Sequence, residues 1–399
     1  MKKSIGIAKN LVLIAAMIFV PASASAHEEL TVEDWHTHRA KTLVESQKIL
    51  TNGIFVNAEQ VRELKDQMND YAINELPSVQ RILKHPSLSS MVVLSTNGDV
   101  LLEHHRADRG LGTVYSVQSS TKLMGHVLIQ KMLKDGKIKL SDLISDYVPG
   151  VSGYKDRTVN DLAAMLIDHT SAELAAYKGD PDALAFYELE DKVYAQALNP
   201  TRAIFQTLLK KIKPAGKDGS TEFKGDVVNY ASSNTNTIAL IAQAVYKRPA
   251  QALVREIMHA IKGENTVYMA TDYEGFPIIG GGLVASSRDF ARFGLLVADK
   301  SAEQFEKELI EAQELGGNVP ADVASVDSKY YRSAMWNEFG LGHSGWGGSL
   351  LWTDPVSGTV VAVITQVNSE LPAPYDHYNK MYSAAIEIVK YQRTKKEQL

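Results

Sequence analysis

Residues 117–124 read VQSSTKLM, in which a serine, Ser119, is followed three positions later by a lysine, Lys122. The apolar residues that come next are spaced as on one face of an α-helix: Leu123, Val127, Leu128, Met132 and Leu133. We therefore expect a helix that begins at this stretch and carries Ser119 and Lys122 one turn apart on the same face. A serine hydroxyl becomes a strong nucleophile when an adjacent base, such as a buried lysine, accepts its proton. Taken alone, the pair is also compatible with a helix-capping serine beside a surface lysine.

The composition is that of an ordinary globular protein. The chain has 399 residues, of which 45% are hydrophobic and 22% charged, enough for one large domain or two interlocked ones. The net charge of −5 and the lack of a basic cluster argue against nucleic acid as a partner. The absence of cysteine excludes disulfides, thiolate chemistry and a lipid-modified cysteine.

The first 26 residues have the pattern of a secretory signal peptide. Lys2 and Lys3 precede an apolar run at residues 11–20 and then the small residues PASASA, which predict cleavage after Ala26. The apolar run is too short to cross a hydrocarbon core of roughly 30 Å. We therefore expect a mature protein that begins at His27, has no membrane anchor, and is periplasmic or secreted.

Local patterns predict the elements that follow. Residues 28–83 look helical, with residues 58–64 (AEQVREL) as a clear helical segment. Two apolar runs flank an Asn-Gly pair at residues 97–98, which is a strong β-hairpin signal. Thr158 is placed to cap a further helix.

The second half returns from helices to strands. Residues 278–284 have strand character and lead into a helix capped near Ser286, and turn residues at 354–358 join two apolar strands. Helical periodicity covers residues 193–212, 235–245 and 378–391.

This order of elements predicts an α+β fold, in which an antiparallel sheet is built from both ends of the chain and flanked by helices. We expect a single domain over residues 27–399. Its α/β part would comprise about residues 27–122 and 270–399, with an all-helical part at about 123–269 inserted between them.

No metal or organic cofactor is predicted. The histidines of the segment His36-Thr37-His38 are two positions apart, a spacing that does not bring them to one face of a helix. The three glycines at 280–282 match no phosphate-binding pattern, and a close approach of the backbone is the better interpretation.

Three short motifs stand in a fixed order along the chain: Ser119-x-x-Lys122, Tyr230-Ala231-Ser232 and His343-Ser344-Gly345. With these motifs the chain resembles the serine β-lactamase-like superfamily, which includes class C β-lactamases, family VIII esterases, D-amino-acid peptidases and 6-aminohexanoate-dimer hydrolases. Residues 161–171, 281–293 and 342–355 also resemble the segments that flank the motifs in that superfamily. The resemblance covers about residues 90–390 and implies the β-lactamase/transpeptidase-like fold.

The resemblance implies a role for each residue of the motifs. Ser119 would attack a carbonyl group and form an acyl-enzyme, with Lys122 and Tyr230 as acid and base. The backbone N–H groups of Ser119 and Trp346 would form the oxyanion hole. Substrate would contact four further residues: Ser232, His343, Ser344 and Gly345. Tyr230 could instead be a core aromatic, His343 a strand histidine with internal partners, and the Trp346 side chain a pocket wall.

Several positions depart from the β-lactamase pattern. His343 stands where many β-lactamases and penicillin-binding proteins have a lysine that would pair with the carboxylate of a β-lactam. Ser232 replaces the asparagine of class C enzymes, and Ala172 replaces a glycine that usually follows the His-Thr-Ser segment. These departures favour an esterase or amidase, and the pattern looks closest to the nylon oligomer hydrolase branch.

The leading hypothesis is an exported serine hydrolase that cleaves a small-molecule ester, amide or peptide through an acyl-enzyme on Ser119. One alternative is a β-lactamase or D-Ala-type cell-wall peptidase, which the missing third-motif lysine disfavours. The other is a non-catalytic, penicillin-binding-like sensor or scaffold. The presence together of Ser119, Lys122 and Tyr230 speaks against that alternative.

Overall fold

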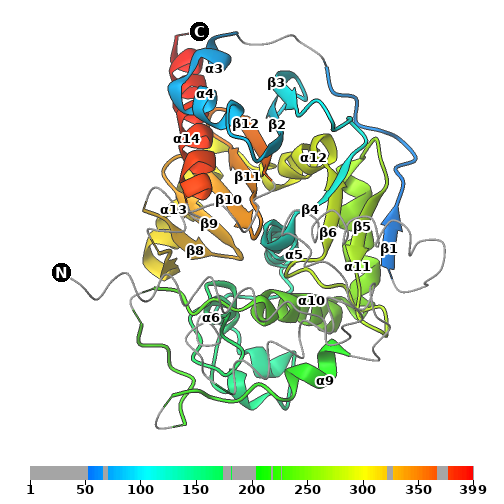
Figure 1. The fold of residues 1–399 in the computed structure, drawn as a ribbon. Helices are drawn as coiled ribbons and strands as arrows, with labels where there is room; N and C mark the ends of the chain where they lie inside the picture. Colours follow the sequence, from blue (N-terminus) through cyan, green and yellow to red (C-terminus); the bar gives the residue numbers. More distant parts are fainter. Residues whose placement is uncertain are drawn as a thin grey trace.

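The computed structural model describes residues 53–65, 71–173, 181, 204–216, 219–225, 227–320, 327–365 and 376–398. Within this part of the chain an eight-stranded sheet has the order β3-β2-β12-β11-β10-β9-β8-β7, and every neighbouring pair is antiparallel. The strands are β2 (Leu88–Ser95), β3 (Val100–His105), β7 (Gly317–Asn318), β8 (Lys329–Tyr331), β9 (Ala334–Asn337), β10 (Gly340–Gly345), β11 (Ser349–Asp354) and β12 (Thr359–Thr365). The pairing of β2 with β12 confirms that both ends of the chain build one sheet (Figure 1).

Helices cover both faces of this sheet. On β12, Val360 and Ala362 pack with α5 (Leu123–Lys134) and α12 (Ser287–Val297), whereas Val361 and Val363 pack with α14 (Asp376–Glu397). The short helices α3 (Tyr71–Glu75) and α4 (Pro77–Leu83) lie beside α14 (Figure 1). Since both faces are buried, the strand is apolar throughout rather than alternating.

A smaller antiparallel sheet has the order β1-β5-β6-β4, formed by β1 (Gly53–Val56), β5 (Val267–Ala270), β6 (Leu283–Ser286) and β4 (Val114–Ser116). The predicted helix at residues 58–64 is wrong, because that segment is irregular and not helical. The backbone N–H of Arg62 donates to the carbonyl of Lys262, and that of Lys65 donates to the carbonyl of Gly98, both at 2.9 Å. Hydrogen bonds to distant segments therefore override local helix propensity here.

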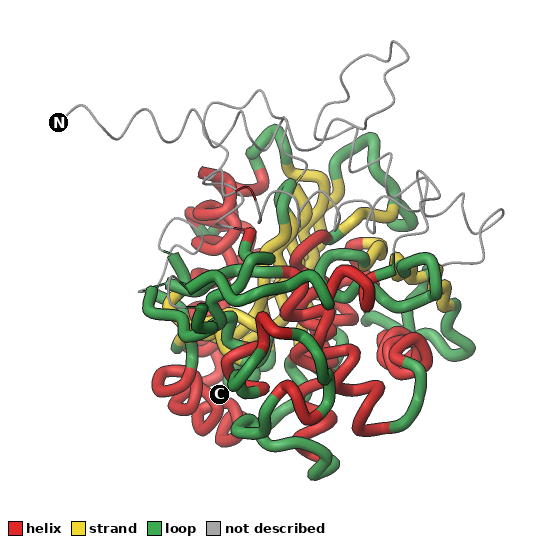
Figure 2. The backbone as a smooth tube through the Cα atoms, turned by 90° about the horizontal axis from the view of Figure 1, so that it is seen from below, coloured by secondary structure: helices red, strands yellow, loops and turns green. Residues whose placement is uncertain are grey.

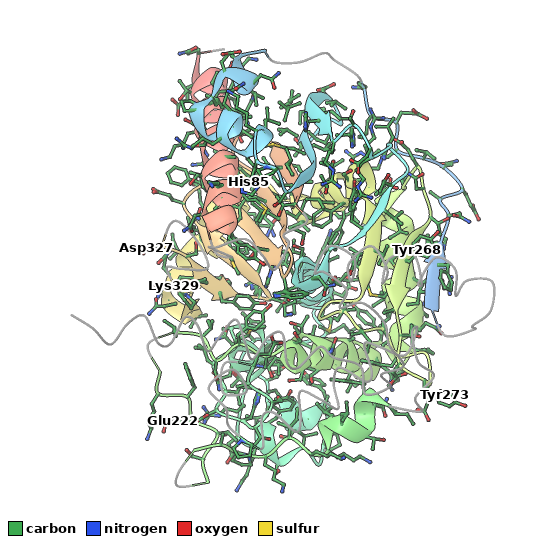
Figure 3. All side chains as sticks on the ribbon, viewed as in Figure 1. His85, Glu222, Tyr268, Tyr273, Asp327 and Lys329 are labelled. Atoms are coloured by element: carbon green, nitrogen blue, oxygen red, sulfur yellow. The ribbon has the colours of Figure 1, made fainter. Side chains whose placement is uncertain are left out.

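The middle of the chain is helical, as expected. It contains α6 (Val159–Ala163), α9 (Phe205–Leu209), α10 (Ser232–Tyr246) and α11 (Ala250–Ile261), with short 3₁₀ turns at Ile144–Asp146 and Ser152–Tyr154. The helix α13 (Ala302–Leu315) follows α12. Figure 2 shows helices and loops gathered in front of the strands when the molecule is seen from below. Glu222 and Tyr273 lie at the outer edge of this helical part (Figure 3).

Local sequence signals account for several of these elements. The turn at residues 97–98 joins β2 to β3, as predicted, with Gly98 at φ +87°. Thr158 caps α6 in a reciprocal capping box with Asp161, and Ser286 caps α12 through the backbone N–H of Asp289. The predicted turn after Asp354 joins β11 to β12.

Some predictions fall outside the described residues, namely the signal peptide at 1–26, the segment from His36 to His38 and most of the predicted helix at 193–212. Among the helices that the structure does describe, none combines the length and the apolar character needed to cross a membrane.

Candidate active site

The serine and lysine of the first motif lie on a 3₁₀ turn, Gln118–Lys122, rather than on an α-helix. The predicted helix is present, but it begins at Leu123 as α5. In a 3₁₀ turn, residues three apart are eclipsed, so Ser119 and Lys122 lie directly above one another. The Lys122 Nζ donates to Ser119 Oγ at 3.1 Å, and the lysine side chain is fully buried. The predicted nucleophile and the predicted base are therefore in hydrogen-bond contact.

A strained residue sets the direction of this turn. Gln118, immediately before the nucleophile, has φ +48°, a left-handed conformation that non-glycine residues seldom adopt. Its side-chain amide donates to Ser116 Oγ at 2.8 Å, which links the turn to the end of β4. The sequence carried no signal for this conformation, since glutamine has no preference for it.

Three acceptors surround the Lys122 amine. Besides Ser119, Nζ donates to Ser232 Oγ at 2.8 Å and to the carbonyl oxygen of Gly280 at 2.7 Å. The ring centroid of Tyr230 lies 4.8 Å from Nζ. The structure thus brings together Ser119, Lys122 and Tyr230, the residues predicted to be catalytic.

The glycine-rich segment at 280–282 places the Gly280 carbonyl against Lys122. A Cβ on Gly282 would lie 2.7 Å from the backbone oxygen of Ile278, so a side chain there would collide with the main chain. The Gly280 N–H donates to Asn236 Oδ1 at 2.7 Å. The segment is a close approach of the backbone, as expected, and it supplies one of the lysine acceptors.

Glu173 lies beside these residues, although the sequence alone does not identify it as part of the site. Ser232 Oγ donates to Glu173 Oε1 at 2.5 Å, and the Ser232 backbone N–H donates to the same oxygen at 3.0 Å. The Glu173 N–H in turn donates to the Tyr230 carbonyl at 2.8 Å. Ser232 is the first residue of α10, whose N-cap, Ala231, has no capping side chain. The carboxylate therefore also serves the N-terminus of a helix, where negative charge is favoured.

Gly345 of the third motif packs closely against the turn that carries Ser119, the predicted nucleophile. Gly345 ends β10, and a Cβ at this position would lie 2.3 Å from the Val117 carbonyl oxygen and 3.0 Å from the Ser119 nitrogen. A glycine is required for strand and turn to approach this closely. Trp346 follows directly, with 36% of its surface exposed.

His343 lies inside the protein beside Tyr230. Only 1% of its surface is exposed, and its ring centroid lies 5.6 Å from that of Tyr330 and 6.1 Å from that of Tyr230. Its Nδ1 is 2.5 Å from the Ser344 carbonyl oxygen. Burial, reinforced by the charge of Lys122, lowers the pKa of His343 to about 3, so the ring is neutral at physiological pH. These partners are internal, and a contact with substrate remains a prediction for His343 and for the buried Ser344.

Within the described residues, no group of three or more histidine, cysteine, aspartate or glutamate side chains is arranged to hold a metal ion.

Comparison with known proteins places the chain in a family. The beta-lactamase family profile matches residues 79–385. A 6-aminohexanoate-dimer hydrolase of Paenarthrobacter ureafaciens is 23% identical over 233 residues, which cover 58% of this chain and 57% of that protein. The chain thus spans somewhat over half the length of this curated relative.

Two solved structures share the fold. One is a Bacillus anthracis protein whose proposed identity is 6-aminohexanoate-dimer hydrolase, with a TM-score of 0.66, 16% identity, and coverage of 94% of this chain and 99% of the other. The other is the D-amino acid amidase of Ochrobactrum anthropi SV3 in complex with D-phenylalanine. It has a TM-score of 0.53 and 12% identity, and covers 81% of this chain and 98% of its own.

The antiparallel sheet, its covering helices and the inserted helical part define a β-lactamase/transpeptidase-like fold. Because the family profile extends over well more than half of the chain, the protein belongs to the beta-lactamase family.

Proposed function

We propose that this protein is an exported hydrolase that cleaves a small-molecule amide or ester through an acyl-enzyme on Ser119. The observation that carries the proposal is the hydrogen bond of 3.1 Å between the buried Lys122 Nζ and Ser119 Oγ. A buried amine in contact with a hydroxyl is one arrangement in which an adjacent base can activate a serine nucleophile.

The proposed reaction has two halves. Lys122 accepts the Ser119 proton while Oγ bonds to the substrate carbonyl carbon, and the N–H groups of Ser119 and Trp346 stabilise the oxyanion. The proton then passes through Lys122 and Tyr230 to the leaving amine or alcohol as its bond to carbon breaks. In the second half, Tyr230 accepts a proton from water as it passes its own proton to the neutral Lys122 amine, and the hydroxide adds to the acyl carbon. The bond from that carbon to Ser119 Oγ then breaks, Lys122 returns the proton to Ser119, and the carboxylic acid departs.

The substrate class is supported by the third motif. A β-lactam carries a carboxylate, and the lysine that would pair with it is replaced by His343, which is neutral at physiological pH. The curated relative is a 6-aminohexanoate-dimer hydrolase, an enzyme named for an amide substrate. We therefore propose an amide or ester without a β-lactam ring, and we place β-lactam hydrolysis and D-Ala-type peptidase activity second.

The decisive experiment compares the mature protein with Ser119→Ala on p-nitrophenyl butyrate, the linear 6-aminohexanoate dimer, D-phenylalanine amide and nitrocefin. We expect serine-dependent turnover of an ester or amide and little turnover of nitrocefin. Rapid nitrocefin hydrolysis would make the β-lactamase function the better one. If a fluorophosphonate probe fails to label Ser119 and no substrate is turned over, the chain is a sensor or scaffold.

Export is proposed from residues 1–26 alone. We expect the protein expressed with these residues in a Gram-negative host to appear in the periplasmic fraction with His27 as its first residue. N-terminal sequencing of that fraction tests the cleavage site, and retention of the intact chain in the cytoplasm would contradict it.

A further inference from the structure

Glu173 lies one hydrogen bond beyond the residues that the proposed reaction uses. We propose that Glu173 is a positioning residue, which acts through the Ser232 hydroxyl to turn the Lys122 lone pair toward Ser119. This inference rests on the proposed function, because it concerns how the base of that reaction is oriented.

The argument starts from the single proton of the Ser232 hydroxyl. That proton is donated to Glu173 Oε1, at 2.5 Å, because an ionised carboxylate can only accept. Ser232 Oγ can then only accept a further hydrogen bond, and it accepts one from Lys122 Nζ, 2.8 Å away. Glu173 therefore fixes the direction of the hydrogen bond between the serine and the lysine.

The direction of the hydrogen bond between Lys122 and Gly280 is also fixed. Gly280 offers a carbonyl oxygen, 2.7 Å from Nζ, which cannot donate. The three hydrogen bonds that Nζ donates to Ser119, Ser232 and Gly280 belong to the protonated lysine. The neutral amine, which acts as the base, has two N–H groups and one lone pair. If its two N–H groups point at Gly280 and Ser232, the lone pair is left for the third neighbour, Ser119 Oγ, at 3.1 Å. This is the orientation in which the amine can accept the nucleophile's proton.

Without Glu173, the Ser232 hydroxyl is released to donate to the lysine lone pair itself. The amine would then present an N–H to Ser119 and could not act as its base. Glu173 is suited to prevent this because it is 92% buried, held by the two hydrogen bonds from Ser232, and fixed by its own N–H to the Tyr230 carbonyl. In this interior position water does not compete for the serine proton.

The carboxylate has a second, separable effect through its charge. Among the described residues, the charged or titratable groups near the Lys122 amine include Tyr230, His343 and, through Ser232, Glu173. The carboxylate favours the protonated amine, so removing its charge favours the neutral base. The acidic limb of the kcat/KM profile should then move to lower pH.

The test compares Glu173→Ala, which removes the acceptor, with Glu173→Gln, which keeps an acceptor oxygen and removes only the charge. We expect Glu173→Ala to lower kcat by about 10- to 100-fold with little change in KM, the loss of one hydrogen bond in a charged network. Glu173→Gln should lose less than about fivefold and shift the acidic limb down by about one pH unit. Glu222→Gln, on the exposed edge of the helical part, is the matched control and should change neither quantity.

A double-mutant cycle completes the test. Because Glu173 acts through Ser232, the effects of Glu173→Ala and Ser232→Ala should not add, and the double variant should be about as active as the slower single one. Additive effects, an effect on KM alone, or a glutamine variant as slow as the alanine variant with an unshifted pH profile would overturn the proposal. If Glu173→Ala fails to fold, as thermal melting would reveal, Glu173→Met takes its place, because it fills the same space without an oxygen to accept the Ser232 proton, and the same loss of kcat is expected.

The inference and the function on which it rests fail differently. Turnover that persists in Ser119→Ala would remove the proposed function, and this inference with it. Turnover that is lost in Ser119→Ala but unchanged in Glu173→Gln and in Glu173→Ala would overturn only the positioning role.

Discussion

The Ser349 hydroxyl donates a hydrogen bond of 2.6 Å to the backbone carbonyl oxygen of Val117, two residues before the nucleophile. Ser120 adds a second link, since its hydroxyl lies 2.9 Å from Ser349 Oγ and donates to the His343 carbonyl at 2.9 Å. The turn that carries Ser119 is thus held to β10 and β11 by buried side chains. The position of the nucleophile depends on the sheet as much as on the helix that follows it.

This link predicts the behaviour of Ser349→Ala. The substitution removes the donor to Val117 and should cost about 1 kcal/mol of unfolding free energy. Because small misplacements of a nucleophile are costly, we expect kcat to fall by about tenfold or more. Urea unfolding and steady-state kinetics measure the two effects. Thr394→Ala, which removes an exposed hydroxyl bonded within α14, is the control and should leave kcat unchanged. An unchanged kcat in Ser349→Ala would contradict the positioning role of the sheet.

Lys122 should be irreplaceable as the base. Lys122→Met removes the amine but keeps the apolar length of the side chain, and we expect kcat to fall by about 10²- to 10⁴-fold, the usual contribution of a general base. Lys122→Arg should not rescue activity, because a guanidinium stays protonated at every working pH. Burst kinetics with a chromogenic ester would show that acylation is the step lost. The control is Lys131→Met, on the exposed side of α5.

Those parts of the fold and of the candidate site that depend on local sequence could be predicted. Ser119 and Lys122 are three residues apart, and the turn at residues 97–98 and the capping Thr158 act within a few positions. Glu173 could not be predicted, since its contact with Ser232 spans 59 residues and no spacing rule connects them.

The wrong predictions of local structure also arose from long-range contacts. Residues 58–64 have helical propensity, but the segment is irregular, and its backbone forms hydrogen bonds to distant parts of the chain. The 3₁₀ turn at Ser119 follows the left-handed Gln118 and packs closely against β10. Neither feature can be recognised from the local amino-acid composition.

Gly345→Ala tests the contact between β10 and the nucleophile. The new methyl group would lie 2.3 Å from the Val117 carbonyl oxygen, and since both are fixed to the backbone, strand and turn must separate. We expect a loss of about 1 to 3 kcal/mol in unfolding free energy, typical of overpacking, and a fall in kcat of about 100-fold from misplacement of Ser119. Gly110→Ala is the matched control, because a Cβ there meets nothing within 4 Å. Equal behaviour of the two variants would show that the close approach is not needed.

Glu103 should make stability depend on pH. Burial alone would raise the pKa of Glu103, but hydrogen bonds from Arg288 at 2.6 and 2.7 Å, together with His105, lower it to about 2. Since the folded-state pKa is depressed from 4.5, the ionised carboxylate stabilises the folded protein above about pH 4.5. This stabilisation is lost as the pH falls toward 2. The fall of the pKa from 4.5 to about 2 corresponds to about 3 to 4 kcal/mol at pH 7. Because the carboxylate is only half-buried, solvent screening should reduce this contribution to about 2 to 3 kcal/mol.

Urea unfolding of the protein and of Glu103→Gln between pH 7 and pH 2 measures this contribution. We expect the wild-type protein to be more stable by about 2 to 3 kcal/mol at pH 7 and the difference to vanish as the pH approaches 2. Glu303→Gln, exposed in the first turn of α13, controls for the loss of one negative charge. Curves for the wild-type protein and Glu103→Gln that stay parallel through this window would mean that the ion pair between β3 and α12 does not lower the pKa of Glu103. The link between these two elements would then rest on packing alone.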